Sequence, residues 1–100
     1  MPGKVSLSVA TNQAAGVAFS ATVSVTNVPV GASITATVSL SRPATDPAWT
    51  QPGAQTAMGP GTVSFTFSSL KLSASAILLA DANDDQSSYY APDAEGVQVP

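Results

Sequence analysis

The chain has 100 residues, of which only 9% are charged, and it contains no Cys and no His. A chain of this length forms one domain. The missing Cys and His exclude disulfides, thiolate or imidazole metal sites, and Ser-His-Asp or Cys-His catalysis. With three cationic residues and a net charge of −3, it lacks the basic patch that nucleic acids and anionic membranes attract.

The first predicted strand covers residues 4–11, after a loose start at residues 1–3. Val5, Leu7 and Val9 alternate with other residues, so one face of this strand is expected to be buried. The same alternation excludes the continuous apolar run of a secretory leader. We therefore expect the chain to remain where it is made, unless a dedicated apparatus exports it.

Residues 16–40 hold the most regular pattern in the chain, and no residue from 5 to 41 is charged. Apolar side chains alternate with small or hydroxyl-bearing ones from Val17 to Val25 and from Ile34 to Leu40, around a turn at residues 27–31. This period of two is typical of half-buried strands. Two such strands need a second sheet to cover their apolar faces, so we predict two packed sheets.

Residues 41–61 differ from the rest of the chain because they contain four Pro and three Gly. Proline cannot donate to a β-ladder, so we predict no central strand here, only short extended pieces near residues 48–50 or 55–57. A connection of this length in a compact domain is usually functional or disordered. The segment is therefore a candidate interaction site.

The second half of the chain adds the remaining strands. Residues 62–68 alternate clearly and predict a strand. The spacing in residues 74–80 fits either a strand or one face of a helix, and we predict the strand because the sheets need this partner. An acidic loop at residues 81–88 and a last strand or two, broken by Pro92, complete the chain.

Together these elements predict one all-β domain over residues 1–100, an antiparallel β-sandwich of about seven strands. Large apolar residues at alternate strand positions are expected to form its core. They are Val5, Leu7, Phe19, Val23, Val25, Ile34, Val38, Val63, Phe65, Phe67 and Leu78.

Several segments carry a resemblance to known domains: GVAFSATVSVTN, VPVG and ASITATVSL, then GTVSFTFSSL, ILLADANDD and GVQVP. In this order they look like an immunoglobulin-like or fibronectin-III-like module of bacteria and their phages. The turn at residues 81–83, after a late apolar strand, is similar to that of adhesion-type domains in bacterial surface proteins. The resemblance spans nearly the whole chain. It implies an immunoglobulin-like sandwich of seven strands with a binding or spacing role.

Five of the six acidic residues gather late in the chain: Asp81, Asp84, Asp85, Asp93 and Glu95. Oxygens at alternate positions of residues 81–85 suit calcium, but the Gly and the bidentate Glu of an EF-hand are not in place. Asp and Asn also hydrogen-bond their own backbone in turns. We predict an acidic turn with no tight metal site and no cofactor, with weak calcium binding as the alternative.

The predicted partner-binding residues are Trp49, Gln51, Gln55, Thr56 and Tyr89. Trp49 is the only Trp and lies among prolines, so it either anchors a partner or plugs the end of the core. The three polar residues offer neutral hydrogen bonds around it. Tyr89 and Tyr90 face opposite sides of a strand, so we expect one ring to pack and the other to be exposed, where it could stack on a sugar.

These features favour a non-enzymatic protein. A charge-poor sandwich without edge lysines invites edge-to-edge pairing, so either its edges are covered or it works inside a larger assembly. By analogy with the Ig-like domains of phages, the leading hypothesis is a bacteriophage capsid decoration protein. It would be located in the virion, in contact with the major capsid protein, other virion proteins and copies of itself. The alternative is an Ig-like module of a bacterial surface or secreted protein that binds carbohydrate or matrix.

Overall fold

Eight strands make up the regular structure of residues 3–100, which are the residues that this computed structural model describes. They are β1 (Gly3–Ser8), β2 (Phe19–Val28), β3 (Ser33–Arg42), β4 (Gln55–Met58), β5 (Gly61–Leu70), β6 (Ala76–Asp84), β7 (Tyr90–Ala91) and β8 (Asp93–Val97). Residues 1–2 of the expected loose start lie outside this range. Within it, no helix is long and apolar enough to span a membrane.

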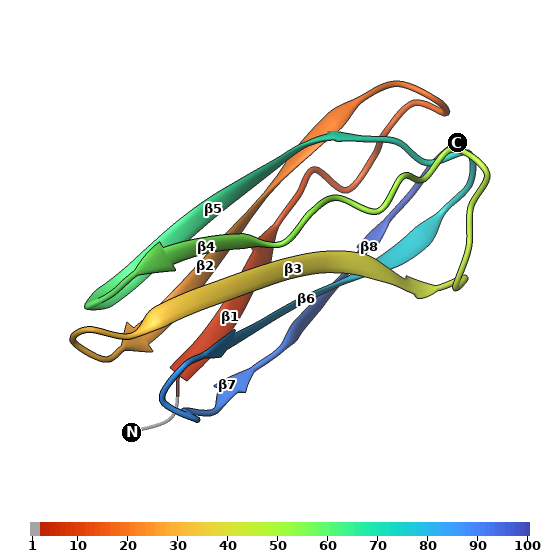
Figure 1. Cartoon of the computed structure of the whole chain (residues 1–100). Coiled ribbons are helices and arrows are strands. Elements are labelled where there is room, and N and C mark those ends of the chain that lie inside the picture. The colour runs from red at the N-terminus through yellow and green to blue at the C-terminus, as the bar shows by residue number, and fades with distance from the viewer. Residues whose placement is uncertain (1–2) are drawn as a thin grey trace.

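The strands form two four-stranded sheets, in the orders β5-β2-β1-β7 and β4-β3-β6-β8 (Figure 1). Neighbouring strands are antiparallel except for β1 and β7, which run parallel. The molecule is elongated, with extents of 42 × 20 × 19 Å, because the long strands all run along its length. The prediction of an all-β chain with two antiparallel sheets packed together is therefore confirmed.

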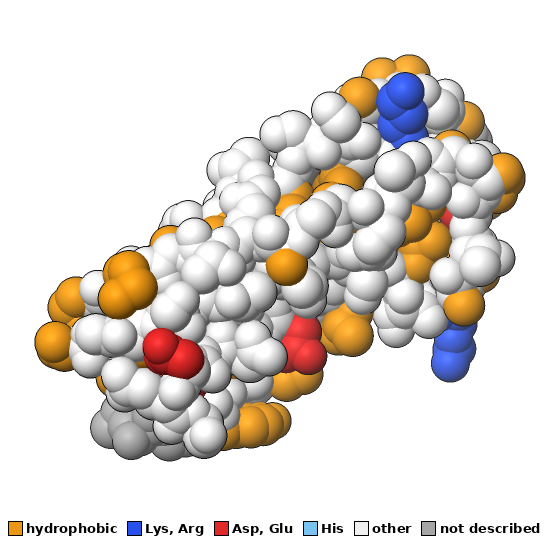
Figure 2. All heavy atoms as spheres, in the orientation of Figure 1, with side chains coloured by type: hydrophobic (Ala, Val, Ile, Leu, Met, Phe, Trp, Pro, Cys, Tyr) orange, Lys and Arg blue, Asp and Glu red, His pale blue; other side chains and the backbone are white. Residues whose placement is uncertain are grey.

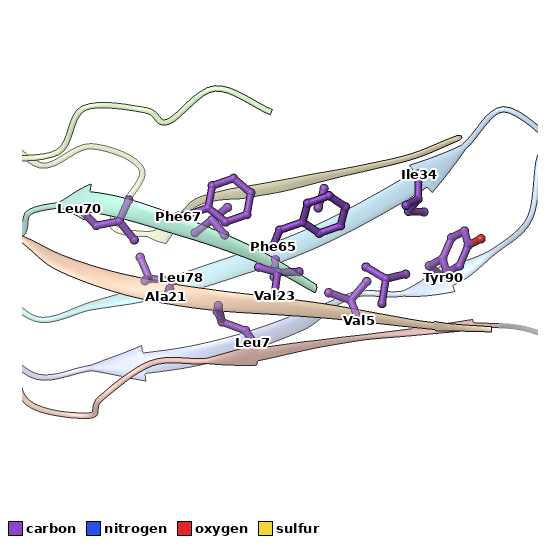
Figure 3. Close-up of a cluster of buried hydrophobic side chains, with 14 of the residues drawn as sticks. Val5, Leu7, Ala21, Val23, Ile34, Phe65, Phe67, Leu70, Leu78 and Tyr90 are labelled. Atoms are coloured by element: carbon purple, nitrogen blue, oxygen red, sulfur yellow. The ribbon is translucent and has the colours of Figure 1, made fainter. Parts of the chain in front are cut away.

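The core lies between the two sheets and is made of the alternate residues that the sequence pattern selected (Figure 3). Phe65 and Phe67, for example, project from β5 into this space, and Ser64 and Thr66 between and beside them are exposed. Every predicted core residue is buried except Val63, which is half-buried. The pattern follows from the alternation of side chains across a pleated strand.

Several strand boundaries differ from the prediction. β1 covers Gly3–Ser8 rather than residues 4–11, and β5 covers Gly61–Leu70 rather than residues 62–68. β2 begins at Phe19, so Val17 lies before the strand and is 57% exposed. Residues 74–80 do contribute a strand, as predicted, but β6 continues to Asp84, so the first half of the expected acidic loop lies in the sheet. Pairing explains this extension, because β3 remains beside β6 as far as Ile34, opposite Asp84.

The last extended segment changes sheets at Pro92, where the sequence predicted a break. β7 pairs with β1 in one sheet and β8 pairs with β6 in the other. Proline between them fits this change, because it has no N–H to donate to either ladder. The end of the chain therefore belongs to both sheets.

Backbone contacts join the sheets along this side of the molecule. Beyond the β1–β7 pairing, the Leu7 N–H donates to Asp93 Oδ2 at 2.8 Å. Further along, the Gln98 N–H donates to the Thr11 carbonyl at 2.6 Å, and the Gln98 carbonyl accepts from the Gln13 N–H at 2.8 Å. We call this the closed side, formed by β1, β7, β8 and the segment that follows each of β1 and β8.

Candidate interaction surface

The opposite side of the sandwich, between β5 and β3, is built differently. Here β5 and β4 are the edge strands of the two sheets. The proline-rich residues 43–54 run along this side, between β5 and β3, before β4 begins (Figure 1). β4 corresponds to the second of the two short extended pieces that the sequence predicted. We call β4, β5 and residues 43–54 the open side.

Two glutamine side chains hold the open side together. Gln51 Nε2 donates to the Val38 carbonyl at 2.7 Å, at a point of β3 that β4 does not reach. Gln55 Nε2 donates to the Thr66 carbonyl of β5, also at 2.7 Å. Each amide satisfies a carbonyl that has no strand beside it. The structure thus gives both residues an intramolecular role, and their binding role stays a prediction.

Trp49 packs half-buried against the core from residues 43–54. Its indole Nε1 donates to Gln51 Oε1 at 3.2 Å, so the ring and the amide fix each other. The sequence left two interpretations of Trp49 open, an anchor for a partner and a cover for the core. This geometry supports the second, with the ring covering the core at the open side. The role of Trp49 as an anchor for a partner stays a prediction.

Thr56 and Tyr89 lie on different parts of the molecule. Thr56 is exposed on β4, with its Oγ1 3.1 Å from Thr35 Oγ1 on β3. Tyr89 lies on the closed side, where its carbonyl accepts a hydrogen bond from the Gly3 N–H at 2.9 Å. Tyr89 lies just before β7 and is 66% exposed, whereas Tyr90 on β7 is buried, so one tyrosine packs and the other is exposed, as predicted. The first four predicted site residues therefore gather on the open side, and Tyr89 stands apart.

Asp46 anchors residues 43–54 to the connection between β5 and β6. Its Oδ1 accepts from the Ala48 N–H at 2.8 Å and from Ser73 Oγ at 2.9 Å, and the Ser73 N–H also donates to the carboxylate. Partial desolvation raises the pKa of Asp46, but these hydrogen bonds outweigh it and the net pKa is lowered. The sequence analysis missed this anchor. The Asp-Pro-Ala run is the signal that could have identified it, since Asp side chains bind backbone N–H groups two residues on.

The acidic segment binds the chain's own groups. Asp84 accepts hydrogen bonds from the N–H groups of Gln86 and Ser88, both at 2.9 Å, and from the Tyr90 hydroxyl at 2.8 Å. Desolvation raises the pKa of Asp84, but the hydrogen bonds lower it to about 2. Burial, with the hydrogen bond and charge of Asp84, raises the pKa of Tyr90 to about 12. No group of three or more acidic, Cys or His side chains in residues 3–100 is placed to hold a metal ion.

Hydrophobic side chains gather at the end of the molecule that carries the β2–β3 and β4–β5 turns (Figure 2). Val30, in the first turn, is 80% exposed, and Met58, at the end of β4, is 61% exposed. The two turns are adjacent, since the Gly59 N–H donates to the Ala32 carbonyl at 3.0 Å. We call Val30 and Met58 the apolar end. The sequence analysis did not single out either residue, although an exposed valine in a Pro-Val-Gly turn is a readable signal.

A groove of about 580 Å³ lies toward the other end of the molecule. Arg42, Ile77 and Gly96 form a row across β3, β6 and β8 along it. Ile77 is on the outward face of β6 and is 37% exposed, and its neighbour Gly96 on β8 has no side chain. Among residues 3–100 no polar side chain is buried, so this open groove lacks the desolvated polar groups that orient a small ligand.

Comparison with known proteins finds no match to this chain among family models, curated proteins or solved structures. The likeness to Ig-like modules accordingly rests on the strand pattern of this chain alone. Function must be argued from the surfaces described above.

Proposed function

We propose that this chain is a non-enzymatic structural protein that docks on a larger protein assembly, and that this assembly is a bacteriophage capsid. In this role it is a decoration protein, located in the virion, whose partners are the major capsid protein or other virion proteins. Neither nucleic acid nor membrane is a partner, because the surface offers too few cations for either.

The order of the strands supports an Ig-like identity for the sandwich. In Ig lettering, β1 to β6 correspond to A, B, C, C′, E and F, and β7 with β8 to a G strand interrupted at Pro92. The sheet β4-β3-β6-β8 then reads C′-C-F-G, and β5-β2-β1 reads E-B-A. Counting the interrupted strand once gives seven strands, with C′ in place of the D strand of the constant-type domain. Phages use such domains on their shells, and the link from this chain to that role is an analogy at the level of the fold.

The apolar end is the observation that carries the docking proposal. Val30 and Met58 are large hydrophobic side chains that remain 80% and 61% exposed on adjacent turns. Exposed apolar clusters on a soluble domain mark interaction sites. Residues 28–34 and 55–61 carry no charge themselves, and the charge beside them is that of Asp85, whose Oδ1 accepts from the Ser33 N–H at 3.0 Å. The elongated domain would then stand on the shell by one end.

The test compares three exposed apolar positions on particles that lack the protein. Val30→Asp and Met58→Asp should each lower the occupancy of added protein, measured by sedimentation. Val17→Asp is the matched control, because Val17 is 57% exposed near the start of β2, at the opposite end of that strand from Val30. Equal occupancy for all three variants would contradict docking through the apolar end.

Trp49→Ala tests the remaining predicted contact residues in the same assay. If residues 43–54 contribute the contact, this variant loses occupancy while its isolated domain stays folded. Because Trp49 is half-buried against the core, its melting temperature is measured beside the occupancy. Full occupancy with a lowered melting temperature would assign Trp49 to the core and leave docking to the apolar end.

Tyr89 is the observation that favours the alternative function, an Ig-like module of a bacterial surface or secreted protein that binds carbohydrate or matrix. Its ring is 66% exposed and can stack on the apolar face of a sugar. Binding to a glycan array that Tyr89→Ala abolishes, without any attachment to particles, would support the alternative over the capsid.

A further inference from the structure

The outer edge of β5 is a row of unpaired backbone groups. β5 has ten residues and pairs with β2 only. In an antiparallel ladder the N–H and C=O of one residue point to the same side, and successive residues alternate. The Thr66 carbonyl accepts from Gln55 rather than from β2, so Thr66 points its backbone groups outward. Ser64 and Ser68, two residues away on either side, share this orientation, and all three residues are exposed.

β5 bulges near its end, where its register with β2 shifts between Phe67 and Leu70 and Ser69 has a φ of 59°, so the regular edge lies before Ser69. Edge strands in soluble proteins usually carry a Lys, a Pro or a bulge that prevents another strand from adding. Residues 61–70 contain no charged residue and no Pro. Within the described chain, the side chain of Gln55 covers a single carbonyl of the edge. The edge is therefore a template for one more extended strand.

We propose that this added strand is β5 of a second copy of the chain. Two copies pair antiparallel along residues 62–68 about a two-fold axis, which joins their β5-β2-β1-β7 sheets into one continuous sheet. The contact is isologous, so it closes at a dimer and leaves no further β5 edge.

Three features favour a second copy as the occupant. Neither edge carries a charge, so the identical strands set no like charges against each other. Self-pairing places hydroxyl side chains opposite hydroxyl side chains, the contact that Ser24 and Ser64 already make at 3.1 Å inside the domain. On the inner face of β5, Val63 is half-buried, and the facing strand supplies the apolar cover that the open side lacks.

Gln55 limits the pairing. Its amide occupies the Thr66 carbonyl, so the side chain must move away or share that acceptor when the second strand adds. A single pair of strands also buries less surface than the roughly 1,600 Å² of a standard stable interface. The association is therefore weak in dilute solution and grows with concentration. It does not depend on docking to a shell, since it concerns the isolated chain.

The test is sedimentation velocity of the isolated chain over a range of concentrations, with two lysine variants. Thr66→Lys places a charge on the edge opposite Ser64 of the other copy and sets the two lysines diagonally across the pair, so it should weaken the dimer by up to about fivefold. Ser8→Lys is the matched control. Ser8, Thr22 and Thr66 form one row across the same sheet, but Ser8 lies on β1, away from the edge. Circular dichroism of each variant is the check that it has folded.

A third variant moves the equilibrium the other way. Gln55→Ala frees the Thr66 carbonyl and should tighten the dimer. A wild-type chain that stays monomeric at every concentration would overturn the proposal in favour of a strand from another protein. A dimer that Thr66→Lys and Ser8→Lys weaken equally would overturn it in favour of another face.

Discussion

The closed and open sides of the sandwich join the same two sheets with different means. On the closed side the backbone crosses from one sheet to the other, and the Leu7 N–H bonds the Asp93 carboxylate between the backbone pairings at either end. On the open side the Gln55 amide joins β4 to β5, while Gln51 and the half-buried Trp49 hold residues 43–54 against β3 and the core. A strand shared by both sheets cannot leave without unfolding, whereas a side chain can rotate away.

This difference suggests that the closed side stabilises the fold and the open side binds a partner. On the closed side the contacts between the sheets are made by backbone pairing and by the part-buried Leu7 N–H, so we expect their loss to cost more stability. The open side is where a partner can be added, because one amide bond to a carbonyl is worth only about 0.5–1.5 kcal/mol net and a partner strand can replace it. Each prediction below breaks or sharpens this contrast.

The largest effect is expected from Tyr90→Ala on the closed side. The Tyr90 ring is buried, bonds Asp84 through its hydroxyl, and packs so closely on Gly3 that a Cβ there would overlap it. Removing the ring should lower the free energy of unfolding by about 3–5 kcal/mol, measured by chemical denaturation. Tyr89→Ala is the control and should stay within about 0.5 kcal/mol, because that ring is exposed. Equal losses would remove the distinction between the two tyrosines.

Asp93→Ala is the next test of the closed side. It leaves the part-buried Leu7 N–H without its acceptor, which should lower the free energy of unfolding by about 1–3 kcal/mol. Asp81→Ala is the charge-matched control, because the Asp81 carboxylate is exposed and accepts from the N–H of the next residue. If both variants lost the same stability, net charge rather than the Leu7 contact would be responsible.

The sequence was sufficient to predict the sheets because hydrophobic alternation is local. β2, β3 and β5 each repeat with a period of two, and this period alone predicts which residues face the core. The exceptions depend on distant residues. β6 reaches Asp84 because β3 lies beside it, and Val63 stays half-buried because the open side has no further strand. The residues next to Asp84 and Val63 in the sequence predict neither feature.

The candidate surface was harder to predict for the same reason. Composition alone set residues 41–61 apart, and four predicted residues do gather on the open side. Their hydrogen bonds, however, join positions far apart in the chain, such as Gln51 with Val38 and Asp46 with Ser73. The apolar end joins two turns that are also distant in the sequence. Local runs such as Asp-Pro-Ala or Pro-Val-Gly can indicate one side of such a contact, but they do not identify the distant partner.

Stability at the extremes of pH should depend on the Asp84–Tyr90 pair. The pKa of Asp84 is lowered from 3.8 to about 2 in the folded chain, so the unfolded chain takes up the proton first as pH falls. The stability that Asp84 contributes is therefore fully present above about pH 4 and is lost as the pH falls toward 2. The pKa of Tyr90 is raised from 10.0 to about 12, so stability also declines between pH 10 and pH 12.

Asp84→Asn separates this pair from the other titrating groups. Denaturation curves at several pH values should show a smaller loss of stability between pH 4 and pH 2 in the variant. Part of the loss should remain, because the pKa of Asp46 is also lowered. An acid profile identical to that of the wild-type chain would mean that the Asp84 hydrogen bonds do not act in solution.

The smallest effect is expected from Gln51→Ala on the open side. It removes the donor to the Val38 carbonyl and the acceptor of the Trp49 indole. Water can reach this side and replace the lost donor, so the cost should be about 0.5–1 kcal/mol, at the low end for one hydrogen bond. Trp49 is the only Trp, so its emission reports on this side alone. The emission should shift to the red in Gln51→Ala and stay unchanged in Asp93→Ala. A stability loss as large as that of Asp93→Ala, with unchanged emission, would show that the two sides do not differ.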